Sequence, residues 1–199
     1  MICGIVLAAG RSRRMGTQKL LLPFAGSSVI SRVVDQLLDS PLDGLFVIVR
    51  ADATGVLKAL ERRHVQTVVN PDRDGDMLSS VRCGLRALPD DCAAVVVALG
   101  DQPTIRAQWI TDMIVACRNS GRGIVVPVHQ GKRGHPLLIS MRYREELLTG
   151  HDGVGVRGLL AAHADDLLEL EFPTPDVLVD LDVPADYQRL TGRPATTEP

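Results

Sequence analysis

Aromatic residues are scarce in this chain of 199 residues, where phenylalanine, tryptophan and tyrosine together make up only 3%. Proteins that bind single-stranded nucleic acid usually stack the bases on aromatic rings, so this scarcity argues against that class of function. A surplus of positive charge is missing as well, because the formal net charge is −2. General affinity for nucleic acid or for an anionic membrane surface is therefore not expected.

Cysteines are few, and their spacing gives no sign of a metal site. The four are Cys3, Cys83, Cys92 and Cys117, without a C-x-x-C pair. We expect reduced and mostly buried thiols, as in a cytoplasmic protein. Long apolar runs are also missing, because none approaches the roughly 18 residues that span a bilayer. The apolar residues 2–9 are too few for a secretory signal and lack its basic flank, so the sequence predicts a cytoplasmic protein without a membrane segment.

The start of the chain lacks both familiar phosphate-binding motifs. A P-loop requires G-x-x-x-x-G-K-[ST], but Gly10 and Gly16 stand one residue too far apart, and Lys19 does not follow a glycine. The dinucleotide fingerprint G-x-G-x-x-G is missing from this run too. If this segment binds a nucleotide, it must hold the phosphates with a different loop.

What the start of the chain does have is an apolar strand that ends in small residues and leads into a basic loop. Residues 5–10 read Ile-Val-Leu-Ala-Ala-Gly, and the basic residues that follow are Arg11, Arg13, Arg14 and Lys19. Small residues let the backbone approach a ligand and expose its N–H groups, while arginine and lysine supply charge for phosphate. The run predicts a nucleoside triphosphate site. An ordinary turn with solvated arginines is the alternative, and the combined spacing disfavours it.

Apolar runs recur along the first two thirds of the chain and are typical of parallel strands covered on both faces. They lie at residues 2–7, 45–49, 65–69, 93–99 and 124–128. Helical patterns lie between them, at residues 28–39, 53–62, 78–88 and 107–118, the first with Ser27 or Ser28 as its N-cap. This alternation predicts the α/β class, with a single-domain, mostly parallel doubly wound sheet and helices on both faces.

Beyond residue 130 the pattern is looser. It predicts short strands at 136–139, 167–171 and 177–180, and helices at 142–149, 155–163 and after Pro184. No internal repeat or long linker divides the chain. We expect one domain over residues 1–190 and a flexible tail over residues 191–199.

Carboxylates follow two of the predicted strands. Asp101 comes just after the apolar run 93–99, and ligands of open α/β sheets bind at the carboxyl ends of strands. Asp101 should therefore lie beside the basic loop that follows the first strand, which we call the first loop. There it could hold Mg²⁺ that bridges phosphate oxygens. Asp180 and Asp182 share one face of an extended segment, and one of them could be a second ligand. Asp101 could instead be a turn residue, and Asp182 could cap the helix after Pro184.

A polar segment at residues 70–81 joins the third predicted strand to a helix. Its serines, Ser79 and Ser80, and the backbone near Gly75 could bond a nucleobase or ribose. A plain N-capped helix is the alternative.

Two loops in the second half could hold another anionic ligand. Residues 131–136, Gly-Lys-Arg-Gly-His-Pro, form a basic loop, and a lone histidine such as His135 is more often structural than catalytic. Residues 151–157 form a loop before a helix, with Arg157 available for phosphate.

Taken in order, five blocks of the chain resemble the small nucleotidyltransferases that attach a nucleotide to molybdopterin, especially the molybdenum cofactor cytidylyltransferases. The blocks are residues 7–23, 70–81, 100–104, 134–136 and 180–184. The resemblance implies a Rossmann-like nucleotidyltransferase fold. Ala-Ala-Gly after Leu7, rather than Ala-Gly-Gly, is closer to the cytidylyl branch than to the guanylyl branch. The chain departs from the family at Val183, where threonine is common, and at residues 151–157, which replace a more compact Gly-Asp-x-Gly-Ala-Arg.

The resemblance also implies roles for individual residues. It makes Lys19, Arg14 and Asp101 the catalytic residues, and Asp101 and Asp182 the ligands of Mg²⁺. The predicted nucleotide-binding residues are Leu7, Ala8, Ala9, Gly10, Arg11, Arg14, Lys19, Asn70, Gly75, Ser79, Ser80 and Asp101. The predicted acceptor-binding residues are Gly134, His135, Pro136 and Arg157.

The predicted reaction is Mg²⁺-dependent transfer of CMP from CTP to molybdopterin, with release of pyrophosphate and a molybdenum hydroxylase as client for the product. The attacking phosphate is already anionic, so alignment and charge neutralisation would carry the catalysis. The alternatives are GTP in place of CTP, another small phosphorylated acceptor, or a non-catalytic chaperone that binds nucleotide or cofactor. Neither nucleic acid nor a membrane is expected as a partner.

Overall fold

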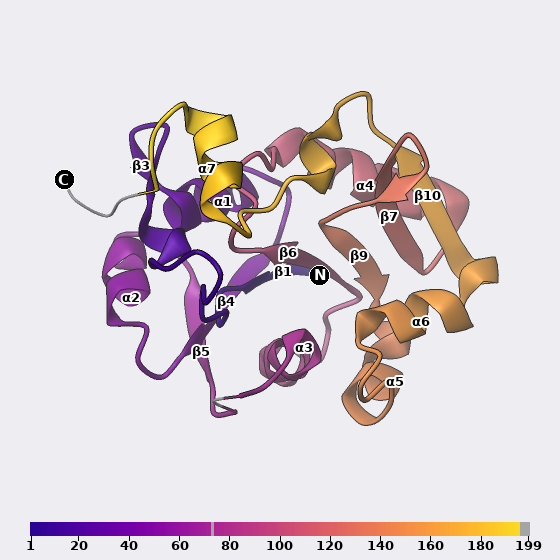
Figure 1. Cartoon of the computed structure of the whole chain (residues 1–199). Helices are drawn as coiled ribbons and strands as arrows, with labels where there is room; N and C mark the ends of the chain where they lie inside the picture. The colour runs from indigo at the N-terminus through magenta and orange to yellow at the C-terminus, as the bar shows by residue number, and fades with distance from the viewer. Residues whose placement is uncertain (73, 196–199) are drawn as a thin grey trace.

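The computed structural model describes residues 1–72 and 74–195. Its centre is an eight-stranded sheet in the order β10-β7-β9-β6-β1-β4-β5, with β8 paired to β7 (Figure 1). The strands are β1 (Ile2–Leu7), β4 (Gly44–Arg50), β5 (Gln66–Asn70), β6 (Ala94–Leu99), β7 (Ile124–His129), β8 (Lys132–Arg133), β9 (Leu137–Ser140) and β10 (Leu167–Glu171). Only β8 and β9 run antiparallel to their neighbours in this sheet, which confirms the predicted α/β class and mostly parallel sheet.

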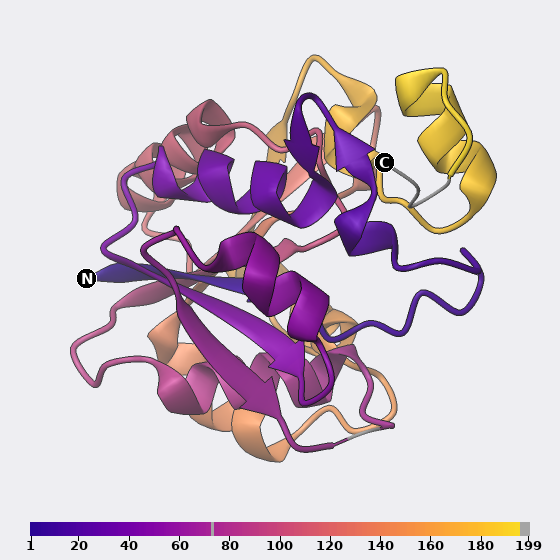
Figure 2. The same cartoon turned by 90° about the vertical axis from the view of Figure 1, so that its left-hand side faces the viewer.

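Helices cover both faces of the sheet, as Figure 2 shows. One face carries α1 (Val29–Leu38), α2 (Thr54–Leu60) and α4 (Ala107–Ser120). The other carries α3 (Met77–Ala87), α5 (Arg144–Thr149) and α6 (Val156–Ala162). Short 3₁₀ helices are η1 (Lys19–Leu21), η2 (Met141–Tyr143), η3 (Ala164–Asp166) and η4 (Pro175–Leu178). Along residues 1–72 and 74–195, every helix is too short or too polar to traverse a lipid bilayer.

Each face of the sheet has its own hydrophobic core, because successive side chains along a strand point to opposite faces. In β1, Ile5 packs with α3 in one core, whereas Val6 packs with α1 in the other, and both are fully buried. Helix α1 buries Ile30, Val33, Val34 and Leu37 in its core. Ser28 caps this helix by accepting a hydrogen bond from the N–H of Ser31 at 3.3 Å, as predicted. The buried faces of β1 and α1 are therefore those that their apolar residues predict.

A third, smaller core joins the C-terminal segment to the region after the first loop. It contains Met15, Leu22, Val29, Leu181 and Tyr187. Tyr187 lies on α7 (Pro184–Thr191), and its hydroxyl donates to the carbonyl of Pro23 at 2.6 Å. Pro23 belongs to the hairpin of β2 (Pro23–Phe24) and β3 (Ser27–Ser28), which lies close to α7 in Figure 1.

Two details of the predicted secondary structure are wrong. The strand expected at residues 177–180 is absent from the described chain, because residues 175–178 form η4, which starts at Pro175 and is capped by the Thr174 hydroxyl. The run 65–69 is not covered on both faces, because β5 is the edge strand and Val69 remains 49% exposed. Residues 196–199 of the expected tail lie outside the described residues.

Candidate active site

The predicted residues gather at the carboxyl-terminal edge of the sheet. Strand β1 lies between β6 and β4, so the chain leaves it at the point where the strand order changes direction, which is where open α/β sheets bind ligands. The first loop follows β1, and Asp101 follows β6. Gly100 permits their contact: its N–H donates to the Leu7 carbonyl at 3.0 Å, and a Cβ there would lie 2.9 Å from that oxygen.

A cavity of about 340 Å³ opens at this edge, between the first loop, the start of α3 and the C-terminal segment. It brings together several of the predicted nucleotide-binding and metal-binding residues. Its lining consists of Leu7, Ala9, Gly10, Arg14, Lys19, Leu20, Gly75, Asp76, Met77, Ser80, Leu99, Asp101, Asp180 and Asp182. The predicted residues Ala8, Arg11, Asn70 and Ser79 lie outside this lining, as do Gly134, His135, Pro136 and Arg157.

Ion pairs dominate the centre of the cavity. Lys19 Nζ lies 2.5 Å from Asp101 Oδ2 and 3.5 Å from Asp182 Oδ1. Arg14 Nη2 lies 2.9 Å from Asp182 Oδ2. The Lys19 and Asp101 side chains are only 13% and 16% exposed, so their attraction is weakly screened by solvent. The N–H of Leu181 donates to the Asp101 carbonyl at 3.1 Å and so holds the C-terminal segment against the end of β6.

The two carboxylates fit a hard divalent cation. They converge on a single ammonium group, which shows that their oxygens can neutralise one cation between them. Within the described ranges, no cluster of three or more acidic, histidine or cysteine side chains could complete an all-protein cage. Two carboxylates with water and phosphate oxygens are the usual ligands of Mg²⁺ at sites of phosphate chemistry.

Asp182 and Asp180 differ in their surroundings. Asp182 pairs with both cations, and it does not cap α7, because the Asp186 carboxylate accepts from the N–H groups of Asp182 and Val183 at 3.0 and 2.9 Å. Asp180 is half-buried, and burial together with the charges of Asp182 and Asp101 raises its pKa. Asp182 is therefore the better placed of the two to share a metal with Asp101.

Asn70 shapes the segment between β5 and α3. Its side-chain oxygen accepts from the N–H of Asp72 at 3.0 Å, and its Nδ2 donates to the hydroxyls of Ser79 and Ser80 at 2.8 and 3.1 Å. Asn70 is only 5% exposed, so these internal bonds engage both ends of its amide. Gly75 is needed in this segment, because a Cβ there would lie 2.0 Å from Ser79 Oγ. Ser80 thus reaches the cavity in an orientation that Asn70 fixes.

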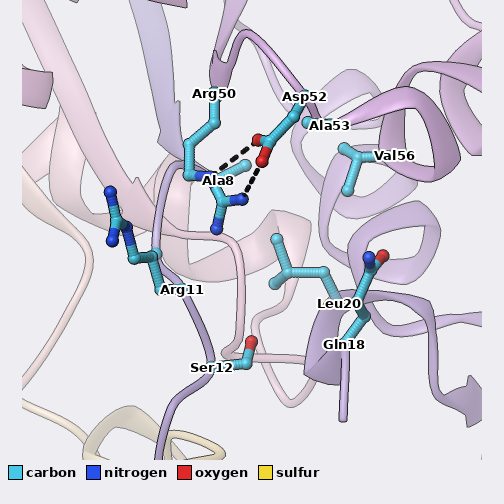
Figure 3. Close-up of a pocket in the computed structure, with 10 residues that line it drawn as sticks. Ala8, Arg11, Ser12, Gln18, Leu20, Arg50, Asp52, Ala53 and Val56 are labelled. Carbon is cyan, nitrogen blue, oxygen red and sulfur yellow. Dashed lines mark hydrogen bonds and ion pairs between the residues drawn. The ribbon is translucent and has the colours of Figure 1, made fainter. Parts of the chain in front are cut away.

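Smaller cavities flank the first loop. Figure 3 shows the residues that line one of them, on the side of α2, among them Ala8, Leu20 and Val56. The volume of this cavity is about 190 Å³. On its wall the Arg50 guanidinium donates to both oxygens of Asp52, at 2.9 and 2.5 Å, and these hydrogen bonds lower the pKa of that carboxyl. The sequence did not lead us to this pair, although Arg50 ends β4 and Asp52 follows it, a place where the strand-end rule predicts ligand-binding residues.

A second flanking cavity, of about 330 Å³, lies between Ala9, Gly10 and the segment that follows β5. Across it Arg11 pairs with Asp74 at 3.0 Å. The first loop therefore makes ion pairs in two directions, through Arg11 to Asp74 and through Arg14 to Asp182 in the cavity of about 340 Å³.

The predicted acceptor loop is packed against η4. The His135 N–H donates to the Val177 carbonyl at 3.0 Å, and a Cβ on Gly134 would lie 2.1 Å from that oxygen. Burial lowers the pKa of His135 to about 4, with the nearby charge of Asp101 opposing the shift and that of Arg157 adding to it. The imidazole is therefore neutral at physiological pH, close enough to Asp101 to feel its charge.

Arg157 is exposed at the start of α6, after a loop that Arg82 holds in place. Arg82 donates to the carbonyls of Leu147 and Gly150 at 2.9 and 2.6 Å, and to Asp152 at 2.7 Å. The sequence analysis missed Arg82, because these partners lie 65 to 70 residues further along the chain and no local pattern signals them.

Comparison with known proteins identifies the family of the chain. Residues 4–167 match the family described as the MobA-like NTP transferase domain. The molybdenum cofactor cytidylyltransferase of Escherichia coli K12 is 25% identical over 98% of this chain and 96% of its own length. A probable molybdenum cofactor guanylyltransferase of Opitutus terrae is 32% identical over 63% of this chain and 59% of its own length.

Solved structures show the same fold. The crystal structure of Rv0371C from Mycobacterium tuberculosis H37Rv, in complex with manganese, superposes with a TM-score of 0.80. It is 27% identical and covers 96% of this chain and 98% of that one.

The fold and the site thus define a nucleotidyltransferase. The chain belongs to the MobA-like NTP transferase family.

Proposed function

We propose that this protein transfers CMP from CTP to molybdopterin in a reaction that depends on Mg²⁺. The observation that carries the proposal is the convergence of Lys19, Asp101 and Asp182 in one cavity, with Arg14 beside them. A nucleoside triphosphate and a divalent ion need these opposite charges together. The cytidylyltransferase of Escherichia coli, which matches nearly the whole chain, supports CTP and molybdopterin as the substrates.

In the proposed reaction a phosphate oxygen of the acceptor attacks the α-phosphorus of CTP. A new P–O bond forms, the bond between the α-phosphorus and the bridging oxygen breaks, and pyrophosphate leaves with that electron pair. Lys19 and Arg14 bind the triphosphate and neutralise the charge that develops on the leaving group. Asp101 and Asp182 would hold Mg²⁺, which would supply positive charge to the phosphates at this place.

The remaining predicted residues take positioning roles in this proposal. The backbone of Ala8, Ala9 and Gly10 lies between the cavities, and Ser80 lines the largest of these three. In the proposal this backbone would cradle the nucleotide, and Ser80 would lie beside the base. The loop of Gly134, His135 and Pro136 would present the acceptor, with Arg157 available for its phosphate. No residue needs to remove a proton, because the attacking oxygen is already ionised. Holding the two phosphates in line is then the main task of the protein.

The guanylyltransferase of Opitutus terrae keeps GTP as the second candidate nucleotide. The manganese in the complex of Rv0371C supports the use of a divalent metal. A cytoplasmic location and delivery of the product to a molybdenum hydroxylase stay predictions.

The test is pyrophosphate release from CTP and from GTP, with Mg²⁺, in the presence and absence of molybdopterin. Release with CTP alone, and only when molybdopterin is present, is the expected result. Release with GTP would move the protein to guanylyl transfer, and nucleotide binding without release would point to another acceptor. Lys19→Ala should abolish the signal, and Lys58→Ala, which removes the same charge from the exposed face of α2, should not.

A further inference from the structure

Gln102 is a buried amide between the metal-binding strand end and the predicted acceptor loop. It follows Asp101 directly and is only 1% exposed. Its Nε2 lies 2.9, 3.2 and 3.4 Å from the carbonyl oxygens of Val177, His135 and Asp176, so its two N–H groups are shared among three acceptors. Because all three acceptors are oxygens, the amide nitrogen must face them, and a flipped amide would set oxygen against oxygen.

Of the three carbonyls, two have other donors. Val177 also accepts from the His135 N–H at 3.0 Å, and Asp176 also accepts from the Thr104 hydroxyl at 2.9 Å. Over residues 1–72 and 74–195, Gln102 is the one donor to the His135 carbonyl. Removing the amide would leave that carbonyl unpaired in a partly buried place. The free-energy cost of an unpaired buried carbonyl is larger than that of losing a hydrogen bond on the exposed surface.

We propose that Gln102 is a positioning residue that fixes the His135 loop relative to Asp101. The assignment of this loop to the acceptor rests on the proposed function. Asp101 and Gln102 are consecutive, so a short and stiff path joins the metal-binding carboxylate to the loop. The loop has little room to adjust by itself, since Gly134 already lies against the Val177 carbonyl. Gln102 thus sets where the attacking phosphate meets the nucleotide.

The test compares Gln102→Met with Thr104→Val. Methionine keeps the length of the side chain and removes the donor. Thr104→Val removes a hydrogen bond to the same η4 segment and leaves the His135 carbonyl paired. We expect Gln102→Met to raise KM for molybdopterin or lower kcat by about tenfold, the value of one hydrogen bond of this kind, with the Kd for nucleotide within twofold of wild type. Thr104→Val should change neither by more than about twofold.

A second measurement does not depend on activity. Amide hydrogen exchange at Gly134 and His135 reports how often the loop opens. We expect exchange there to be about tenfold faster in Gln102→Met and unchanged in Thr104→Val. If Gln102→Met does not fold, Gln102→Asn can replace it, because it keeps the donor on a shorter side chain. We expect it to increase amide exchange at Gly134 and His135 by a smaller factor.

Equal exchange at Gly134 and His135 in wild type and Gln102→Met would overturn the proposal. An equal loss of nucleotide binding and acceptor binding would also overturn it, because a general structural role predicts that pattern. If the wild-type protein does not use molybdopterin but the exchange results hold, the proposed function fails and the coupling of the loop to Asp101 stands.

Discussion

Asp101→Asn is the sharpest test of the active site, because it removes one charge and keeps the shape. The Asp101 carboxylate lies 2.5 Å from Lys19 Nζ and is 16% exposed, whereas Asp182 lies 3.5 Å away and is 36% exposed. Asp101 therefore interacts more strongly with any cation at this place. We expect kcat to fall at least about 100-fold in Asp101→Asn, the usual cost of losing one electrostatic contact to the reacting phosphates. Asp182→Asn should cost less, about tenfold, because solvent screens its carboxylate more.

The matched control is Asp180→Asn. This residue lines the same cavity, but its carboxyl has a raised pKa and makes no ion pair in the described structure. We expect kcat within about threefold of wild type, as for a polar substitution away from the reacting groups. The assay is steady-state pyrophosphate release at saturating nucleotide, with the Mg²⁺ concentration varied. If Asp101→Asn kept turnover within threefold of wild type, or if Asp180→Asn were the more damaging change, the assignment of Asp101 and Asp182 would be refuted.

Other predictions concern the surroundings of the site. Asn70→Ala should raise KM for nucleotide about tenfold, because it frees the hydroxyl of Ser80, and steady-state kinetics with CTP would check this. Gly134→Ala should lower the free energy of unfolding by about 1–3 kcal/mol, because its Cβ meets the Val177 carbonyl, and urea unfolding measures it. His135 has a pKa of about 4 in the folded state, below its ordinary 6.5, so the unfolded chain binds more protons between these values. The free energy of unfolding should therefore fall as the pH drops through that window, by up to about 3 kcal/mol, and less in His135→Gln; equal pH dependence in the two proteins would contradict this.

Most of the fold could be predicted because its signals are local. The strands β1, β4, β6 and β7 are short, nearly continuous apolar runs, and their length is typical of a strand buried on both faces. The error at residues 177–180 has a physical reason. That segment is apolar enough for a strand, but Pro175 and the Thr174 cap start a 3₁₀ turn, and packing against the His135 loop keeps it.

Some residues of the candidate site could be predicted from local sequence, and others could not. Lys19 and Asp101 could be placed together from the strand-end rule, since both follow strands whose ends meet at one edge. The residue pattern alone left the choice between Asp180 and Asp182 open, and the resemblance to the family implied Asp182. In the structure the two differ because Asp182 forms ion pairs with Arg14 and Lys19, which lie far from it in the sequence. Gln102 is a further case, because its three acceptors all lie in segments that approach it only in the folded chain.

The C-terminal segment has a consequence for how the protein is made. Asp182 belongs to the last part of the chain, and α7 behind it is anchored by Tyr187 to the carbonyl of Pro23. During synthesis Lys19 and Asp101 emerge from the ribosome well before Asp182. Until Asp182 is made, the nascent chain has the ion pair between Lys19 and Asp101 but lacks the one between Lys19 and Asp182. The proposed site should therefore close only after the segment from Asp182 to Tyr187 has been synthesised. A chain cut short before Asp182 would still contain every strand of the large sheet and yet lack the second carboxylate.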